Sequence, residues 1–273
     1  MELLFIIILL IIIIVIIYIY QSKKENYTKK EKYTNSFPDC LTVYDINNKI
    51  RLGNNGDGGY VIYDIDNQQN QKNIYDCYIS CGVSNEESFS RDFIKKYNMN
   101  KDNSFAFDGT IEDYPYEYTK DITFFKKNIG NKNDDKTTNL DFLFERYNNI
   151  FLKMDIEGWE FEWLLQLTQD KLEKIKQIAI EVHGVNDDSW NFKQTDKIDC
   201  FNKLNEKFYL IHLHGNNNGG IQNNIPDVLE LTYLNKNVLN YIPEKNKKKL
   251  PSNLDYPNCH KDDYQLNIPP FVN

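Results

Sequence analysis

The stretch Ile150–Leu165, IFLKMDIEGWEFEWLL, decides what kind of fold this chain adopts. It begins as a short apolar run, ends that run with two carboxylates and a glycine, and continues at helical spacing. A buried strand that passes through acidic residues into a helix is typical of open α/β sheets, whose ligands bind outside the carboxyl ends of the strands. The pattern therefore predicts Asp155 and Glu157 as site residues. The alternative is that Asp155 only caps the following helix.

The two carboxylates are expected to have different surroundings. Side chains alternate along a strand, so Asp155 and Glu157 share a face only if the strand stays extended through both. We expect the turn to begin at Ile156. Asp155 then points toward the ligand, and Glu157 becomes a residue of the first helical turn, where its charge suits the helix dipole.

The beginning of the chain is almost wholly aliphatic from Leu3 to Ile19. This run meets the requirement of about 18 apolar residues for a membrane-spanning helix, and an acidic start with no small-residue cleavage site argues against a signal peptide. We predict an anchor at 1–20, a polar basic linker at 21–36 and one domain at 37–273. The lysines after the anchor favour a cytosolic domain, whereas the sequon at Asn26 would fit the opposite orientation.

The net charge and the cysteine spacing argue against a nucleic-acid-binding protein and against a zinc-binding protein. The net charge is −8 and the lysines are dispersed among acidic residues, which argues against nucleic acid as a partner. The five cysteines show no CxxC spacing. They indicate reduced thiols and give no zinc signature.

Strand-like and helix-like segments alternate through the middle of the chain. Strands are expected at 74–80, 104–108, 122–129, 150–154, 177–184, 209–217 and 228–234, and helices at 86–97, 138–147 and 192–208, with another after 158. Alternation of this kind predicts an α/β fold with a mostly parallel sheet covered on both faces. The last two strands are joined by a loop, which indicates an antiparallel pair at one edge.

Glycine-containing turns mark possible approaches to a ligand. The glycine cluster at 53–59 indicates a hairpin turn, from which Asp57 could approach a ligand. Gly82 falls at a strand-to-helix turn, although no GxGxxG is present. Asp108 ends the next expected strand, and an acidic residue about 20 residues after such a glycine turn is where related folds bind ribose hydroxyls. The alternative for Asp108 is an Asx-turn with Gly109.

The segments GDGGYVI, YISCGVSNEESF, FAFDGTI, LKMDIEGWE, IAIEVHG, HLHGNN and VLELTYL, in this order, resemble the Rossmann-like S-adenosylmethionine-dependent methyltransferases of the methyltransferase-like/FkbM type. The resemblance implies a seven-stranded sheet with an antiparallel last strand and S-adenosylmethionine as cofactor. It places Cys81, Gly82 and Val83 under the methionine part of the cofactor, Asp108 at the ribose and Asp155 beside the transferred methyl group. A departure is Ser84, which stands where the broader class has a glycine.

The resemblance also implies a sugar or another small hydroxyl compound as acceptor. An oxygen nucleophile must lose its proton, and His183 is the best base by residue type. Asp155, His183 and Glu157 are therefore the predicted catalytic residues. The alternative for His183 is a ring held by hydrogen bonds at a strand end.

Three further interpretations stay open from the sequence. Asp155, Glu157, His183 and His214 could share a divalent metal, although their spacing does not establish one. A nicotinamide-dependent oxidoreductase is disfavoured by the missing GxGxxG. A membrane-tethered binding module that lost catalysis is the remaining alternative.

Overall fold

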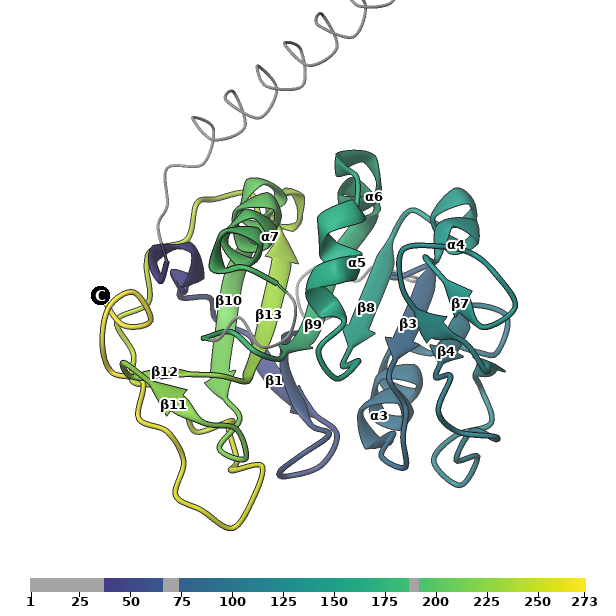
Figure 1. Ribbon diagram of the computed structural model, residues 1–273, viewed down its shortest axis with the longest axis horizontal. Coiled ribbons are helices and arrows are strands. Elements are labelled where there is room, and N and C mark those ends of the chain that lie inside the picture. Colours follow the sequence, from purple (N-terminus) through teal and green to yellow (C-terminus); the bar gives the residue numbers. More distant parts are fainter. Residues whose placement is uncertain (1–36, 66–73, 187–191) are drawn as a thin grey trace, which may run out of the picture. The chain divides into compact units, whose positions relative to one another are not determined.

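The stretch Ile150–Leu165 forms the predicted strand and helix, β8 (Ile150–Met154) and α5 (Glu160–Gln166). The computed structural model describes residues 37–65, 74–186 and 192–273. Within them, β8 belongs to a seven-stranded sheet of order β10-β13-β9-β8-β3-β4-β5 (Figure 1). The other strands of this sheet are β3 (Cys77–Cys81), β4 (Ser104–Phe107), β5 (Thr123–Phe125), β9 (Ile175–Val182), β10 (Phe208–Gly215) and β13 (Leu229–Asn235).

Strand directions agree with the predicted topology. β8 runs parallel to β3 and β9, and β4 runs parallel to β3 and β5. β13 is antiparallel to both β9 and β10, so the last two strands form the expected antiparallel pair, with β10 outermost. The carboxyl ends of the parallel strands consequently meet at one edge of the sheet.

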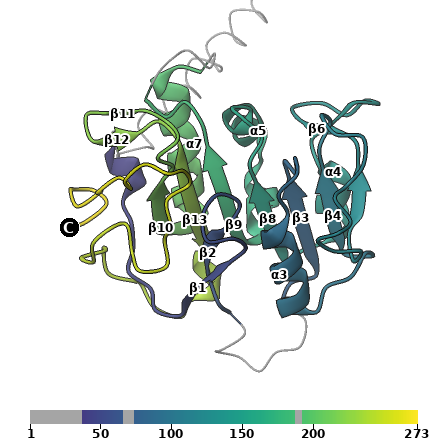
Figure 2. The same ribbon diagram turned by 90° about the horizontal axis from the view of Figure 1, so that it is seen from below.

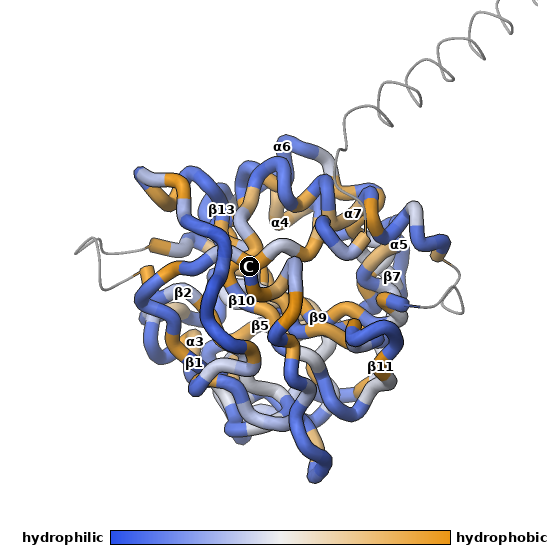
Figure 3. Tube along the Cα trace, turned by 90° about the vertical axis from the view of Figure 1, so that its left-hand side faces the viewer, coloured by the Kyte–Doolittle hydropathy of each residue, from blue (hydrophilic) through white to orange (hydrophobic). Residues whose placement is uncertain are grey.

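Both faces of the sheet are covered, but by different elements (Figure 2). The covering helices are α3 (Ser88–Tyr97), α4 (Asp141–Arg146), α5, α6 (Gln169–Lys174) and α7 (Gln194–Lys207). Successive side chains of a strand point to opposite faces of the sheet, so the buried residues form one cluster on each face. In β8, Leu152 packs into the cluster formed with α4 to α7, whereas Phe151 packs against Phe93 of α3. The second face is completed by the hairpin of β1 (Lys49–Leu52) and β2 (Tyr60–Tyr63). Figure 3 shows hydrophobic segments in the interior and hydrophilic loops around them.

Two predicted elements differ from the structure. The strand expected at 122–129 is divided: β5 ends at Phe125, and β6 (Asn128–Ile129) pairs with β7 (Thr137–Thr138) in a separate parallel ladder. The helix expected at 138–147 begins only at Asp141, because Thr138 belongs to β7 and Leu140 has a left-handed backbone (φ 67°). Two lysines follow Phe125, of which Lys126 is exposed, and they interrupt the apolar run that suggested one long strand.

The predicted membrane anchor and linker lie outside the described residues. Among the residues that are described, no helix is both long and apolar enough to cross a membrane. Two short 3-10 helices (Asp39–Leu41 and Lys236–Val238) and a small hairpin of β11 (Ile221–Gln222) and β12 (Ile225–Pro226) complete the assigned elements.

The segment after β13 is fastened to the sheet by His214. The ring of His214 is buried on β10, with Nδ1 2.9 Å from Glu230 Oε2 and Nε2 3.0 Å from Asp263 Oδ2. Glu230 is its partner across the β10–β13 pairing, whereas Asp263 comes from the C-terminal segment. Burial lowers the pKa of His214, but the hydrogen bonds to Asp263 and Glu230 outweigh burial and raise it to about 10.

This contact predicts a loss of stability at alkaline pH. Because the folded pKa of His214 is above the value of 6.5 for a free histidine, its contribution is complete below pH 6.5 and disappears as the pH rises toward 10. We expect His214→Gln to lower the free energy of unfolding by about 3 kcal/mol at pH 6 and to remove this part of the pH dependence. Denaturant titrations between pH 6 and 10 measure both effects. His260→Gln, at an exposed histidine, is the control, and an unchanged pH profile in His214→Gln would contradict the assignment.

Candidate active site

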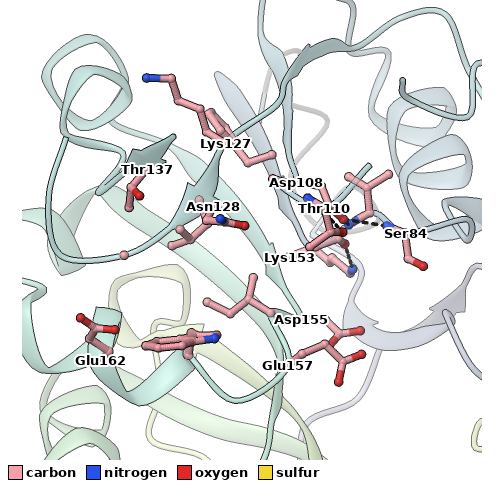
Figure 4. Close-up of a pocket in the computed structure, with 18 of the residues that line it drawn as sticks. Ser84, Asp108, Thr110, Lys127, Asn128, Thr137, Lys153, Asp155, Glu157 and Glu162 are labelled. Atoms are coloured by element: carbon pink, nitrogen blue, oxygen red, sulfur yellow. Dashed lines mark hydrogen bonds between the residues drawn. The ribbon is translucent and has the colours of Figure 1, made fainter. Parts of the chain in front are cut away.

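A cavity of about 760 Å³ lies at the carboxyl ends of β3, β4 and β8. Its walls come from the turn after β3, the end of β4, the segment 127–132 after β5, and the residues after β8. Figure 4 shows Ser84, Asp108 and Lys153 on one side and Lys127 and Asn128 across from them. The cavity therefore occupies the place that the ligand rule for open α/β sheets predicts.

Asp108 organises the turn after β3. Its Oδ2 accepts hydrogen bonds from the backbone N–H groups of Val83 (3.0 Å) and Ser84 (2.9 Å). Its Oδ1 accepts from the backbone N–H and the hydroxyl of Thr110, at 2.7 and 2.5 Å. Burial raises the pKa of Asp108, but these hydrogen bonds outweigh it and lower the pKa below its usual range. The Asx-turn alternative is thus realised, on a carboxylate that also lines the cavity.

Gly82 is required by the close approach of two strand ends. Its backbone has φ 78°, and a Cβ atom there would lie 1.5 Å from the carbonyl oxygen of Asp155. The neighbouring Ser84 also has a left-handed backbone, with φ 49°. This conformation favours glycine, which accounts for the glycine that the resemblance leads one to expect at position 84.

Asp155 lies at the boundary between the cavity and the protein interior. It lines the cavity, and its backbone N–H donates to the carbonyl of Cys81 at 2.9 Å. Its Oδ2 is 3.5 Å from the hydroxyl of Tyr60, and its Oδ1 is buried without a hydrogen-bond partner among the described residues. Burial raises the pKa of Asp155, while Lys153 and His183 oppose the rise. Asp155 does not cap α5, since the N-cap is Trp159.

Glu157 is not in the first helical turn, contrary to our expectation. It occupies a left-handed turn (φ 55°), its side chain is 83% exposed, and α5 begins only at Glu160. The role expected of it belongs to Glu160, whose carboxylate accepts from the backbone N–H groups of Ile156 (3.0 Å) and Gly158 (3.1 Å). The helix after Asp155 thus begins too late to include Glu157 in its first turn.

His183 follows β9 and lies among carboxylates behind the cavity wall. Its Nδ1 is 3.2 Å from Glu160 Oε1, and its Nε2 is 3.5 Å from Glu157 Oε2 and 3.6 Å from Glu181 Oε1. Burial lowers the pKa of His183, but the contact with Glu160 and the nearby carboxylates raise it overall. His183 is thus held at a strand end, as its alternative proposed, while close to Asp155.

The structure brings most of the predicted residues together. Gly82, Val83, Asp108, Asp155 and Glu157 all line the cavity. Cys81 does not contribute to its wall: the side chain is fully buried in the core beneath α4 to α7, and burial raises the pKa of its thiol. His214, considered above as a metal ligand, is held by Glu230 and Asp263 instead.

Several polar residues near the site were not predicted. Lys153 lies two residues before Asp155 on the buried strand β8, and its Nζ donates to the carbonyl of Gly82 at 2.6 Å. Glu87 is buried and accepts from Ser80 (3.1 Å) and Tyr114 (2.8 Å). A lysine inside an apolar strand, in the same alternation as Asp155, is the signal that could have identified Lys153.

The fold is that of a Rossmann-like α/β protein, and its cavity lies at the carboxyl ends of the first, second and fourth strands of the seven-stranded sheet. The model of the Methyltransferase FkbM domain matches residues 44–246. The chain therefore belongs to the FkbM methyltransferase family, as the sequence motifs predicted. A search of curated proteins and a search of solved structures found no match.

Proposed function

We propose that this methyltransferase uses S-adenosylmethionine to methylate a hydroxyl group of a sugar or another small molecule. The observation that carries the proposal is the cavity itself, which extends from the turn held by Asp108 to the carboxylate of Asp155. Its volume of about 760 Å³ falls in the range of about 300–1,000 Å³ that is common for small-molecule sites. Family membership supports the reaction class.

The lining residues suit the two ends of this cofactor. Asp108, Thr110 and Asn128 offer polar groups to a nucleoside, and Asn85 and Glu86, beside the turn, can pair with an amino-acid end. When bound, S-adenosylmethionine supplies a sulfonium methyl group for transfer to a nucleophile. The residues of the chain then have two tasks, which are to hold the acceptor in line and to receive its proton.

Asp155 is the residue that we assign to the acceptor. It is the predicted catalytic residue that lines the cavity wall and has a buried oxygen without a hydrogen-bond partner in the described part of the chain. A carboxylate there can orient the acceptor hydroxyl and accept its proton. Asp57, from the loop of the β1–β2 hairpin, also lines the cavity and is available to bind acceptor hydroxyls. His183 lies close to Asp155, outside the cavity wall, where its ring contacts Glu160.

Calorimetry and product analysis test the proposal. We expect S-adenosylmethionine to bind and NAD⁺ and NADH to give no heat. Incubation with a panel of sugars and other hydroxyl compounds should yield S-adenosylhomocysteine and a product heavier by one methyl group, detected by mass spectrometry. Binding of a nicotinamide dinucleotide would indicate an oxidoreductase, and binding of neither cofactor would indicate a module that lost catalysis.

A substitution at Asp108 tests the cofactor end. We expect Asp108→Ala to weaken binding of S-adenosylmethionine by about 10- to 100-fold, or about 1.5–3 kcal/mol. The variant should also be less stable than wild type, since Val83, Ser84 and Thr110 lose their acceptor. Asp108→Asn, which retains one acceptor oxygen, separates the two effects when binding and thermal unfolding are measured together. If folded Asp108→Ala bound S-adenosylmethionine with wild-type affinity, Asp108 would only stabilise the turn and would not contact the cofactor.

We also propose that the apolar run at 3–19 tethers the enzyme to a membrane, with the domain on the cytosolic face. The support is the sequence alone, namely an aliphatic run followed by lysines. Detergent should be needed to extract the full-length chain, and release by carbonate or high salt would contradict the anchor. Glycosylation at Asn26 in cells would reverse the orientation.

A further inference from the structure

Three side chains from two adjacent strands converge beside the acceptor end of the cavity. Asp155 follows β8, and Glu181 and His183 come from the end of β9 and directly after it. One potential ligand atom from each of the three lies within 4.8 Å of the other two. The convergence follows from the topology, because β8 and β9 pair in parallel and Glu181 and His183 are two residues apart.

Glu181 and His183 of this cluster are buried, Asp155 is half-buried, and one oxygen of Asp155 has no hydrogen-bond partner among the described residues. Glu181 is 4% exposed and His183 is 8% exposed. Asp155 Oδ1 is buried and accepts no hydrogen bond from the described residues. A buried carboxylate oxygen without a donor or a cation is costly, so a bound ligand at this position would relieve the cost.

Residues around the cluster fix its orientation. His183 Nδ1 is 3.2 Å from Glu160 Oε1. With the proton on Nδ1, Nε2 carries a lone pair, and Glu181 Oε1 lies 3.6 Å and Glu157 Oε2 3.5 Å from it. Glu181 Oε1 in turn accepts a hydrogen bond from Asn216 Nδ2 at 2.8 Å. A histidine that donates one N–H to a carboxylate while its other nitrogen binds a metal is a recurring arrangement in metalloproteins.

The charge balance also favours a cation. Around His183 stand the carboxylates of Glu157, Glu160 and Glu181, with Asp155 close by. Lys153 is the nearby lysine, and its ammonium group donates to the carbonyl of Gly82. Carboxylates therefore outnumber the cationic groups beside His183, which suits a bound cation.

We propose that Asp155, Glu181 and His183 form a binding site for a divalent transition-metal ion, with Mn²⁺ as its representative. Two carboxylates and one imidazole suit such ions better than Ca²⁺, which prefers oxygen ligands alone. Three protein ligands leave coordination positions open, as in catalytic rather than structural sites. Resting on the proposed function, the ion would bind the acceptor hydroxyl and make its proton easier to remove. A carboxylate that coordinates the ion through one oxygen keeps the other for that proton.

Titration of the full-length chain with Mn²⁺ tests the site without cofactor or acceptor. After treatment with EDTA and its removal, loss of the free Mn²⁺ signal in electron paramagnetic resonance should report one tightly bound ion per chain. Glu181→Gln, which keeps the shape of the side chain, should weaken binding at least about 10-fold. Glu162→Gln makes the same chemical change at another cavity residue and should bind Mn²⁺ like wild type.

Thermal unfolding provides a second readout. Mn²⁺ should raise the midpoint of wild type and of Glu162→Gln but not that of Glu181→Gln. Asp155→Asn serves the same purpose if Glu181→Gln does not fold. The proposal is overturned if wild type binds no Mn²⁺ or if both ligand variants bind it with wild-type affinity. Because no methyl transfer is measured, metal binding by a chain that fails to methylate would refute the proposed function and leave this site intact.

Discussion

Asp155→Asn is expected to reduce methyl transfer by about 10²- to 10⁴-fold while leaving the affinity for S-adenosylmethionine nearly unchanged. The substitution preserves the size of a side chain that lines the cavity but removes the charge that orients the acceptor and accepts its proton. Cofactor affinity is retained because the turn held by Asp108 does not depend on this carboxylate. Single-turnover rates at saturating cofactor, with cofactor binding measured by calorimetry, give the two quantities.

Glu157→Gln is the matched control for Asp155→Asn. Glu157 lies two residues further along the same turn, but its side chain is 83% exposed. Solvent already screens its charge, so we expect the turnover of Glu157→Gln to stay within about threefold of wild type. A dead Glu157→Gln enzyme beside an active Asp155→Asn enzyme would reverse the roles assigned to the two carboxylates.

Gly82→Ala is expected to destabilise the folded protein strongly and thereby to abolish cofactor binding. The added Cβ would lie 1.5 Å from the carbonyl oxygen of Asp155, and the backbone at position 82 has φ 78°. The two strand ends are also joined by the hydrogen bond from the Asp155 N–H to the Cys81 carbonyl, which a separation of the strands would break. We expect a loss of about 3–5 kcal/mol in the free energy of unfolding and the loss of measurable cofactor binding.

Gly220→Ala provides the comparison, because no atom lies within 4 Å of a Cβ built there. Its stability should stay within about 0.5 kcal/mol of wild type. Denaturant titration of the two variants, followed by calorimetry with S-adenosylmethionine, separates a general cost of alanine from the specific collision. A Gly82→Ala protein with wild-type stability and affinity would show that the ends of β3 and β8 are not locked together.

Much of the fold could be predicted because its determinants are local. The apolar run that forms β8 and the alternation of strand and helix come from hydrophobic patterns within a few residues. The same patterns located Gly82, Asp108 and Asp155 at strand ends, and parallel strands bring such ends to one edge. The failures were also local, as at 122–129, where a charged interruption divided one expected strand into β5 and β6.

The chemistry of the site depends on distances that sequence patterns do not contain. Glu160 and His183 are 23 positions apart, and their contact exists because α5 returns over the end of β9. The place of Cys81 in the core, rather than in the cavity wall, depends on which face of β3 its side chain occupies. Such contacts follow from register and packing between elements.

The sequence by itself therefore determined the order of strands and helices, the family, and the edge of the sheet that carries the site. The tertiary structure alone decided that one buried oxygen of Asp155 meets no hydrogen-bond partner among the described residues, that Glu157 faces solvent, and that Glu181 joins Asp155 and His183. The physical reason is that hydrophobic periodicity acts along a single element, whereas burial and charge contacts are set where separate elements pack together.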